Sequence, residues 1–242
     1  MRGNRWTLGV IALLALGFLA LDWSRLVLRP ADLSASRWSD LLKVCLTFAA
    51  TTIAWRARGS GLGEGDEKRF RVIFSIVLIA DVCFAASLQP VGILLFAAAH
   101  VLLVRRNLVG LSAARERVRA QAPLLIAIAL AAAAVIVATV NWIYRMQGVT
   151  PLLIVIGVYV AMLWGSVTAA WVARAISHYP ARNTLLMAIG MALFELCDVN
   201  VAANLALPVG TMRVITESLT WMFYGPALCL ISLSAWRAEA AG

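Results

Sequence analysis

The sequence predicts an all-α membrane protein, a bundle of eight transmembrane helices with both termini cytoplasmic. Of its 242 residues, 62% are hydrophobic and only 14% are charged, and the mean hydropathy is +0.88. A soluble domain carries roughly a quarter charged residues. The apolar runs approach the roughly 20 residues of a helical span and lack the alternation of barrel strands. Backbone polar groups in lipid must be satisfied internally, so we expect helices.

Hydropathy and helix-breaking residues divide the chain into eight predicted spans, which form a single transmembrane domain over residues 1–242. The first span follows two arginines, as a signal peptide does, but no small-x-small cleavage site comes after it, so we expect a retained helix. The predicted spans are residues 6–23, 39–55, 70–88, 91–106, 121–142, 150–172, 183–205 and 214–236.

The segments between the spans predict short or solvated connections. The loop RARGSGLGEGDEKRFR after the second span is glycine-rich and charged, and SLQPVG after the third is short enough for a tight antiparallel hairpin. The loop VRRNLVGLSAARERVRAQ after the fourth span is basic and partly amphipathic. We expect both charged loops to be solvated connectors beside lipid.

The distribution of basic residues predicts the orientation. With the N-terminus inside, fifteen Lys and Arg residues fall in cytoplasmic loops and five in external loops, while Lys43 lies within the second span. Cytoplasmic loops of membrane proteins carry this excess, so both termini should be cytoplasmic. The formal charge of +9 is then explained by topology and by contact with anionic membrane lipids, and no nucleic-acid partner is expected. The expected location is a bacterial inner (cytoplasmic) membrane.

Two acidic residues, Asp81 and Asp198, interrupt apolar runs in the third and seventh spans. A carboxylate in hydrocarbon costs several kcal/mol, so an intramembrane acid is a candidate functional residue. Both lie roughly 10 Å below the outer boundary, at about 1.5 Å per helical residue. The third and seventh spans run in the same direction, so the two carboxyl groups are expected at one depth, facing one internal cavity.

Other titratable residues gather in the middle and outer half of the predicted bundle. Lys43 lies about one turn into the second span, while His100, Tyr159 and Tyr224 lie near the middle of the fourth, sixth and eighth. Each has a second interpretation: Lys43 could snorkel to the interface, His100 could bond a backbone carbonyl, and the tyrosines could be ordinary aromatic packing.

Glu195 lies three residues before Asp198, on the same helical face. Two carboxylates so close in a medium of low dielectric do not both ionise cheaply, so one of them is expected to hold a proton.

Several other chemistries lack their residues. A metal hydrolase needs several His and carboxylate ligands, and only His100 and His178 are present. No P-loop, dinucleotide-binding glycine motif or G-x-S-x-G elbow occurs. No CxxC pair occurs either, so neither a disulfide framework nor structural zinc is expected. We therefore expect no metal and no organic cofactor. The four cysteines all lie inside predicted spans: Cys45, Cys83, Cys197 and Cys229.

The succession of these motifs resembles the YhhN-like family of eight-span membrane proteins, whose characterised members are lysoplasmalogenases. The similarity covers the second to the eighth span. The matching segments are DLLKVCLTF with Lys43, FSIVLIADVCF with Asp81, GILLFAAAHVLL with His100, GVYVAMLWGS with Tyr159, GMALFELCDVNVAANL with Asp198 and FYGPALCLISLS with Tyr224.

Three positions depart from the family pattern. Cys197 stands where a serine usually precedes the second aspartate, Val44 follows the lysine in place of proline, and Ala227 follows the YGP sequence where a glutamine is common. These departures affect the polar contacts of the substrate, so another ether lipid is an alternative substrate.

The resemblance implies hydrolysis of the vinyl ether bond of a lysophospholipid, a lysoplasmalogen, to a fatty aldehyde and a glycerophospho-alcohol. A neutral carboxylic acid would deliver a proton to carbon, and an ionised carboxylate would stabilise the oxocarbenium-like cation and activate water. Glycosidases use two carboxylates against a similar cation. Lys43 would keep one acid ionised, and the division of roles stays open. Asp81 and Asp198 are the expected catalytic pair, with supporting roles for Lys43, His100, Tyr159, Glu195 and Tyr224.

Two other classes of function remain. Intramembrane acids also serve proton-coupled transporters, but the matched helix breaks of inverted-repeat carriers are lacking and the repeat signal is weak. In a non-catalytic scaffold the aspartates would only bond neighbouring helices. Protein partners cannot be inferred from the sequence.

Overall fold

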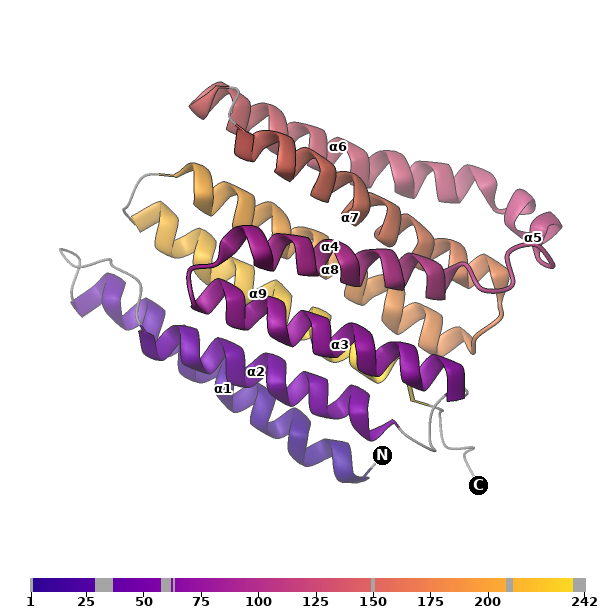
Figure 1. Ribbon diagram of the computed structural model, residues 1–242, viewed down its shortest axis with the longest axis horizontal. Helices are drawn as coiled ribbons and strands as arrows, with labels where there is room; N and C mark the ends of the chain where they lie inside the picture. The colour runs from indigo at the N-terminus through magenta and orange to yellow at the C-terminus, as the bar shows by residue number, and fades with distance from the viewer. Residues whose placement is uncertain are drawn as a thin grey trace.

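The protein is a bundle of long helices (Figure 1). The computed structural model describes residues 2–28, 37–57, 62, 64–148, 151–207 and 211–236. Regular structure within these residues is helical, which confirms the predicted all-α class. The helices are α1 (Arg2–Leu28), α2 (Arg37–Arg56), α3 (Glu64–Ala85), α4 (Gln89–Asn107), α5 (Arg115–Ala120), α6 (Ala122–Gln147), α7 (Pro151–Ile176), α8 (Ala181–Ala206) and α9 (Thr211–Leu233).

Every predicted span coincides with one long helix, and the extra helix is α5. Its six residues, RERVRA, lie in the basic loop that we predicted to be a plain connector. Pro90 occupies the first turn of α4 and Pro123 that of α6, where the missing N–H costs no helical hydrogen bond.

Among the described residues, five helical segments are long and apolar enough to cross a membrane by length and composition. A shorter apolar segment, Trp6–Leu21, lies in α1, while α2 and α3 contain more charged residues. These helices are consistent with an integral membrane protein. The five segments are Gln89–Asn107, Ala122–Met146, Ile156–Ile176, Ala181–Asn204 and Thr211–Leu233.

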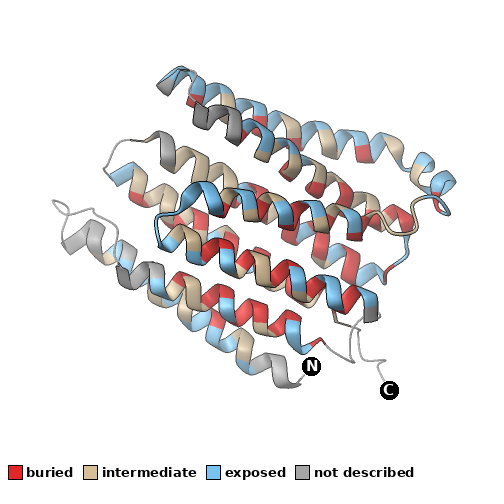
Figure 2. Cartoon of the chain, viewed as in Figure 1, coloured by how far each residue is buried: buried red, intermediate tan, exposed pale blue. Residues whose placement is uncertain are grey.

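Six helices form a closed ring in the order α2, α3, α4, α7, α8 and α9, and each contacts the next. Outside the ring, α1 packs against α2 and α9, and α6 packs against α7 and α8. Figure 1 shows α1 and α6 at opposite edges. In Figure 2 buried residues concentrate on the ring helices, whereas α6 is largely exposed, as expected for a helix that faces lipid.

The two ends of the bundle differ in what they connect. At one end α1 begins and α9 ends, and we call this the terminal end; the turn between α3 and α4 lies at the other, the hairpin end (Figure 1). This turn confirms the predicted tight hairpin, since only residues 86–88 separate the two helices. Ser87 has a φ of 61° there, an uncommon value for a residue other than glycine.

The two halves of the chain repeat the same arrangement. In α1–α4 and again in α6–α9, the first helix lies outside the ring and the next three follow one another within it. Both halves start at the terminal end (Figure 1), so the repeat is parallel and not inverted. Asp81 and Asp198 each lie on the third helix of their half.

The sequence carries two short traces of this parallel repeat. The stretch DVCFAASL from Asp81 aligns with DVNVAANL from Asp198, and TIAWRAR (52–58) aligns with TAAWVAR (168–174). In the second alignment Lys43 of α2 corresponds to Tyr159 of α7. The same scaffold therefore presents a cation in one half and a phenol in the other.

A buried ion pair of the first half contacts Tyr179 of the second half at the terminal end. Arg106 of α4 donates to Asp66 of α3 from Nε at 2.8 Å and from Nη2 at 3.2 Å. Its guanidinium lies between the rings of Phe70 and Tyr179, 4.4 and 4.3 Å from their centroids. Burial raises the pKa of Tyr179, in the α7–α8 connection, to about 12, so this hydroxyl keeps its proton and donates to Asp66 at 3.1 Å. The cluster is internally matched in charge and hydrogen bonds.

Candidate functional site

Asp81 is held by hydroxyl groups from two other helices. Its Oδ2 accepts a hydrogen bond from Thr47 of α2 at 2.5 Å and from Tyr224 of α9 at 2.8 Å. The three side chains are buried. The consecutive helices α2 and α3 and the distant helix α9 therefore converge on this carboxyl group.

Asp198 is the end of a chain of hydrogen bonds that crosses into the other half. Its Oδ2 lies 2.6 Å from the hydroxyl of Tyr159, which lies 3.3 Å from Nε2 of His100. The Nδ1 atom of His100 lies 2.9 Å from Oγ of Ser166, and Ser166 donates to the backbone oxygen of Leu163 at 2.9 Å. His100 is only 1% exposed, so this chain is sealed from solvent at the histidine.

Aromatic rings fill the space between the two carboxyl groups. Phe194 of α8 contacts His100 edge-on, with ring centroids 5.1 Å apart, and Tyr224 with centroids 5.4 Å apart. Phe96 of α4 packs against Phe194 and Tyr224. These rings connect Tyr224, which bonds Asp81, with His100, whose chain of hydrogen bonds ends at Asp198. The two hydrogen-bonded groups therefore belong to one site.

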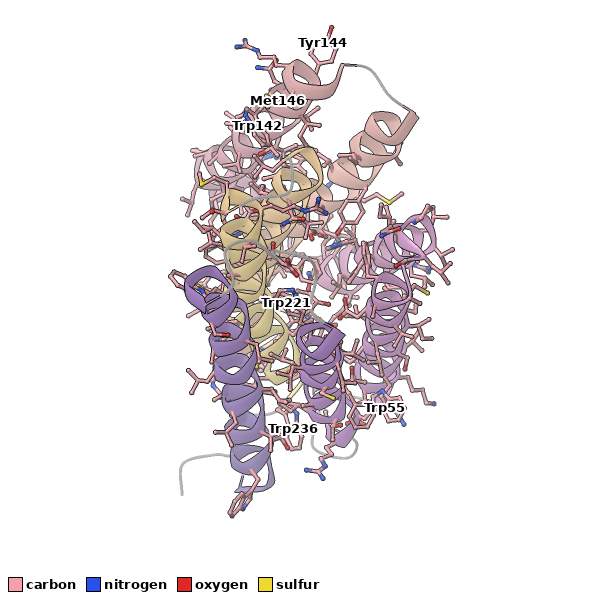
Figure 3. All side chains as sticks on the ribbon, turned by 90° about the vertical axis from the view of Figure 1, so that its left-hand side faces the viewer. Trp55, Trp142, Tyr144, Met146, Trp221 and Trp236 are labelled. Atoms are coloured by element: carbon pink, nitrogen blue, oxygen red, sulfur yellow. The ribbon has the colours of Figure 1, made fainter. Side chains whose placement is uncertain are left out.

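A pocket of about 150 Å³ opens beside Asp81, among residues near the end of α3, which leads into the hairpin turn, and near the starts of α2 and α9. Lys43 and Glu217 form an ion pair of 2.5 Å in it, and the Lys43 ammonium lies 5.3 Å from the centroid of Trp221. Figure 3, viewed from the hairpin end, shows Trp221 at the centre of the bundle. The lining residues are Lys43, Val44, Asp81, Phe84, Ala85, Glu217 and Trp221.

The structure changes one expectation about this pocket. Lys43 is buried and paired, so the alternative in which it snorkels to the interface is wrong. The lining of this pocket includes Asp81 and not Asp198, and a single cavity that faces both carboxyl groups stays a prediction. The ring of Tyr224, which contacts Phe194, lies beside Asp81 on the way to Asp198.

The remaining predicted residues have distinct surroundings. Glu195 is 6% exposed, and its Oε1 has no hydrogen-bond partner among the described residues. Cys197 is a buried free thiol, and Val44 lines the pocket. Ala227 is fully buried at the α8–α9 contact, where its backbone oxygen would lie 3.2 Å from a Cβ on Gly190. Of the three departures from the family pattern, only Val44 therefore lines the pocket.

Sequence reasoning missed Thr47, Ser166 and Glu217 as members of the site. Thr47 follows Lys43 by four residues, and Ser166 follows Tyr159 by seven. Both spacings keep the side chains on one helical face, and this periodicity could have found them. Glu217 begins the eighth predicted span, and its partner Lys43 lies 174 positions away in the sequence, so no local spacing connects the two.

The arrangement suits acid–base chemistry in an apolar enclosure. It holds two carboxyl groups with unlike hydrogen-bond partners, two phenols, one imidazole and one ion pair. In the described parts of the chain, no three His, Cys, Asp or Glu side chains come together as a metal site would need.

Comparisons of the chain with protein-family models, with curated proteins and with solved structures give no match.

Proposed function

We propose that the protein is an intramembrane hydrolase that cleaves the vinyl ether bond of lysoplasmalogens. The observation that carries the proposal is the pair of carboxyl groups on equivalent helices of the two halves. One is held by two hydroxyls, and the other by a phenol linked to a buried imidazole. Carboxyl groups in unlike surroundings are suited to opposite roles in acid–base catalysis.

The reaction divides naturally between such groups. A carboxylic acid protonates the vinyl carbon remote from oxygen, which leaves an oxocarbenium ion at the carbon bonded to oxygen. A carboxylate stabilises this cation and takes a proton from the water that attacks it. The resulting hemiacetal collapses to the fatty aldehyde and the free glycerol hydroxyl. One water is consumed, and the proton returns to the acid, so no metal or organic cofactor is needed.

The pocket supports a zwitterionic lysolipid headgroup as the recognised part of the substrate. Lys43 can pair with a phosphate, Glu217 can pair with an ammonium, and Trp221 presents an aromatic face to the same cation. The hydrocarbon chain would lie against the apolar surfaces of the bundle and reach the site laterally from the bilayer.

The proposal includes the membrane topology. All eight long helices cross a bacterial inner membrane with both termini in the cytoplasm, so the terminal end is cytoplasmic. Arg105, Arg106, Arg117, Arg119 and Arg174 lie near that end, as the positive-inside rule requires. The pocket then opens in the outer half of the membrane.

The test uses purified protein in detergent with lysoplasmenyl-ethanolamine and lysoplasmenyl-choline, and it measures the aldehyde released. We expect metal-independent turnover that falls by at least about 1,000-fold in Asp81→Asn and in Asp198→Asn, since each removes an acid–base group. Aldehyde release at the wild-type rate in both variants would refute the acid–base proposal.

A carrier is the second candidate, because parallel repeats with a site between the halves also occur in transporters. It predicts no aldehyde release and a proton-coupled flux in vesicles that the same two variants abolish. A scaffold predicts neither activity and no functional difference between the variants and the wild type. The two assays together separate the three readings.

A further inference from the structure

We propose that Asp198 is the proton-donating acid and Asp81 the carboxylate, and that His100 and Ser166 are positioning residues that keep the proton on Asp198. The catalytic meaning of this assignment rests on the proposed hydrolase function. The protonation assignment itself rests on the hydrogen-bond chain from Asp198 to Leu163 and can be measured without substrate.

The direction of the chain is set at its serine end. A serine hydroxyl has one hydrogen to donate and two lone pairs to accept. Oγ of Ser166 lies 2.9 Å from the carbonyl oxygen of Leu163, which can only accept. The single hydrogen of Ser166 therefore points at that carbonyl. Its Oγ accepts from Nδ1–H of His100, which lies 2.9 Å away.

The position of the hydrogen on His100 decides the direction of its hydrogen bond with Tyr159. A neutral imidazole carries one N–H, and here it is on Nδ1, so Nε2 is an acceptor. The hydroxyl of Tyr159 lies 3.3 Å from Nε2 and is the donor that satisfies it. The Tyr159 oxygen lies 2.6 Å from Oδ2 of Asp198. If the hydrogen of Tyr159 is directed to His100, this short contact is a hydrogen bond only when Oδ2 donates to Tyr159, which requires Asp198 to be a carboxylic acid.

A charged alternative uses the same number of protons but is less favourable here. Moving the proton from Asp198 through Tyr159 would give an imidazolium on His100 and a carboxylate on Asp198. His100 is 1% exposed, and separating two charges in a buried, apolar site carries a large desolvation cost. The neutral arrangement of the chain therefore prevails.

Asp81 is a hydrogen-bond acceptor, in contrast to the donor proposed for Asp198. Its Oδ2 accepts hydrogen bonds from the hydroxyl groups of Thr47 at 2.5 Å and Tyr224 at 2.8 Å. The other acceptor of Thr47, the backbone oxygen of Lys43, is farther away at 3.4 Å. Two converging O–H donors match a carboxylate oxygen. The cation of Lys43 lines the same pocket as this carboxylate.

The return of a proton to Asp198 after the reaction follows from a competition for one hydrogen. After Asp198 protonates the vinyl carbon, its carboxylate and Nε2 of His100 both require the hydrogen of Tyr159. Whichever group does not receive it loses a hydrogen bond, and this loss favours transfer to Asp198 of the proton that Asp81 takes from the attacking water. Ser166 maintains the competition because it holds the imidazole hydrogen on Nδ1.

The charged and titratable groups around Asp198 are consistent with this assignment. A carboxylate on Asp81 disfavours a second negative charge nearby, and so does an ionised Glu195. The groups that face or adjoin Asp198 come from each neighbouring element: Asp81 of α3, His100 of α4, Tyr159 of α7, Glu195 and Cys197 of α8, and Tyr224 of α9, while α6 carries Tyr144 and Arg145 in its last turn.

Infrared difference spectroscopy of the purified protein at neutral pH tests the assignment directly. We expect Asp198→Asn to remove a carboxylic-acid C=O band, and Asp81→Asn to remove carboxylate bands and leave the acid band intact. Glu195→Gln is measured in parallel, because this carboxyl is also buried. An acid band that disappears in Asp81→Asn and persists in Asp198→Asn would overturn the assignment, as would an acid band that neither variant removes.

The positioning role is tested with three serine variants. Ser166→Ala frees the imidazole to carry its hydrogen on Nε2, which stabilises ionised Asp198 through Tyr159. We expect the acid band and the alkaline limb of the kcat profile to move by roughly one pH unit toward lower pH, the equivalent of one hydrogen bond. Ser166→Thr keeps the hydroxyl and should retain the wild-type profile.

Ser232→Ala is the matched control. Ser232 is also fully buried and donates to the carbonyl three residues earlier, Cys229, at 3.0 Å, but it belongs to no chain leading to Asp198. A shift of equal size in Ser232→Ala, or none in Ser166→Ala, would contradict the positioning role. An acid band on Asp198 in a protein that releases no aldehyde would refute the hydrolase function and leave the protonation assignment standing.

Discussion

The first and second halves of the chain place an aspartate on equivalent helices but surround it differently. In the first half Asp81 lies beside a pocket that also contains Lys43. In the second half the residue aligned with Lys43 is Tyr159, which bonds Asp198 directly and connects it to His100. The shared scaffold puts both acids at the centre of one ring, and a few side chains differentiate them.

This comparison explains how one apolar bundle can hold two carboxyl groups in opposite protonation states. Each aspartate receives contacts from both halves: Asp81 from Thr47 and Tyr224, and Asp198 through Tyr159 from His100. Neither half alone contains a complete site. The opposite roles proposed for the acids therefore depend on how the halves pack against each other.

The largest effect after loss of either aspartate is expected from Tyr159→Phe. This variant removes the hydroxyl through which Asp198 is connected to His100. A hydrogen bond to a group that becomes charged contributes about 1.5–3 kcal/mol, so kcat/KM should fall about 100-fold. Tyr144→Phe is the control, because that tyrosine is 49% exposed on α6. Similar rates for Tyr159→Phe and wild type would contradict the distinction between the halves.

The first half should tolerate single losses better, because two hydroxyls support Asp81. We expect Tyr224→Phe and Thr47→Val each to lower kcat about 10-fold and the double variant about 100-fold, as each removes one donor to the carboxylate. A double-variant cycle on aldehyde release measures this. If Tyr224→Phe alone were as harmful as Tyr159→Phe, the two acids would be equally dependent on their phenols.

A smaller effect, confined to one class of substrate, is expected at the pocket. Glu217 has a side chain that is 28% exposed and pairs with Lys43. Glu217→Gln should raise KM several-fold for headgroups with an ammonium, since a partly exposed ion pair contributes up to about 1 kcal/mol. KM for a glycerol headgroup should not change.

The control for this experiment is Glu116→Gln, because Glu116 is 85% exposed on α5. An equal change in KM for ethanolamine and glycerol headgroups would show that Glu217 stabilises the pocket but does not recognise the ammonium group of the substrate.

The smallest effect on the reaction is expected at the terminal end. Arg106→Met leaves Asp66 buried without its cation, which costs about 3–5 kcal/mol of stability, yet aldehyde release per folded molecule should stay at the wild-type level. Thermal unfolding in detergent measures the loss. Arg119→Met is the control, since Arg119 is 80% exposed and its ion pair with Glu116 is solvated. A large change in kcat for Arg106→Met would contradict this expectation, because it would show that the ion pair at the terminal end affects the reaction.

Much of the fold could be predicted from the sequence because lipid imposes a strong constraint. The eight predicted spans correspond to eight long helices, of which five contain described segments long and apolar enough to cross a membrane, and the turn SLQPVG forms the expected hairpin. The short α5 was missed, since its charged residues predict solvation and carry no apolar period. The parallel repeat was also missed, because it survives in two short stretches and not in the whole pattern of hydropathy.

The sequence could identify the titratable residues of the site, but it could not identify their hydrogen-bond partners. Asp81, Asp198, Lys43, His100, Tyr159 and Tyr224 are conspicuous because each places a polar group in an apolar run. Ser166 and Thr47 are not, since a hydroxyl in a membrane helix can bond its own backbone, as Thr52 does with the carbonyl of Phe48. Which hydroxyls face a carboxyl group depends on helix rotation.

The sequence by itself determined the class of fold, the positions of the helices and the presence of one acid in each of two apolar helices, because these follow from local hydropathy. Only the tertiary structure decided which partners each acid has. Tyr224 lies 143 residues from Asp81 and Tyr159 lies 39 residues from Asp198, and such contacts arise from the order of helices around the ring. That order gives Asp81 two hydroxyl donors and Asp198 a phenol backed by an imidazole, and on this difference the proposed roles depend.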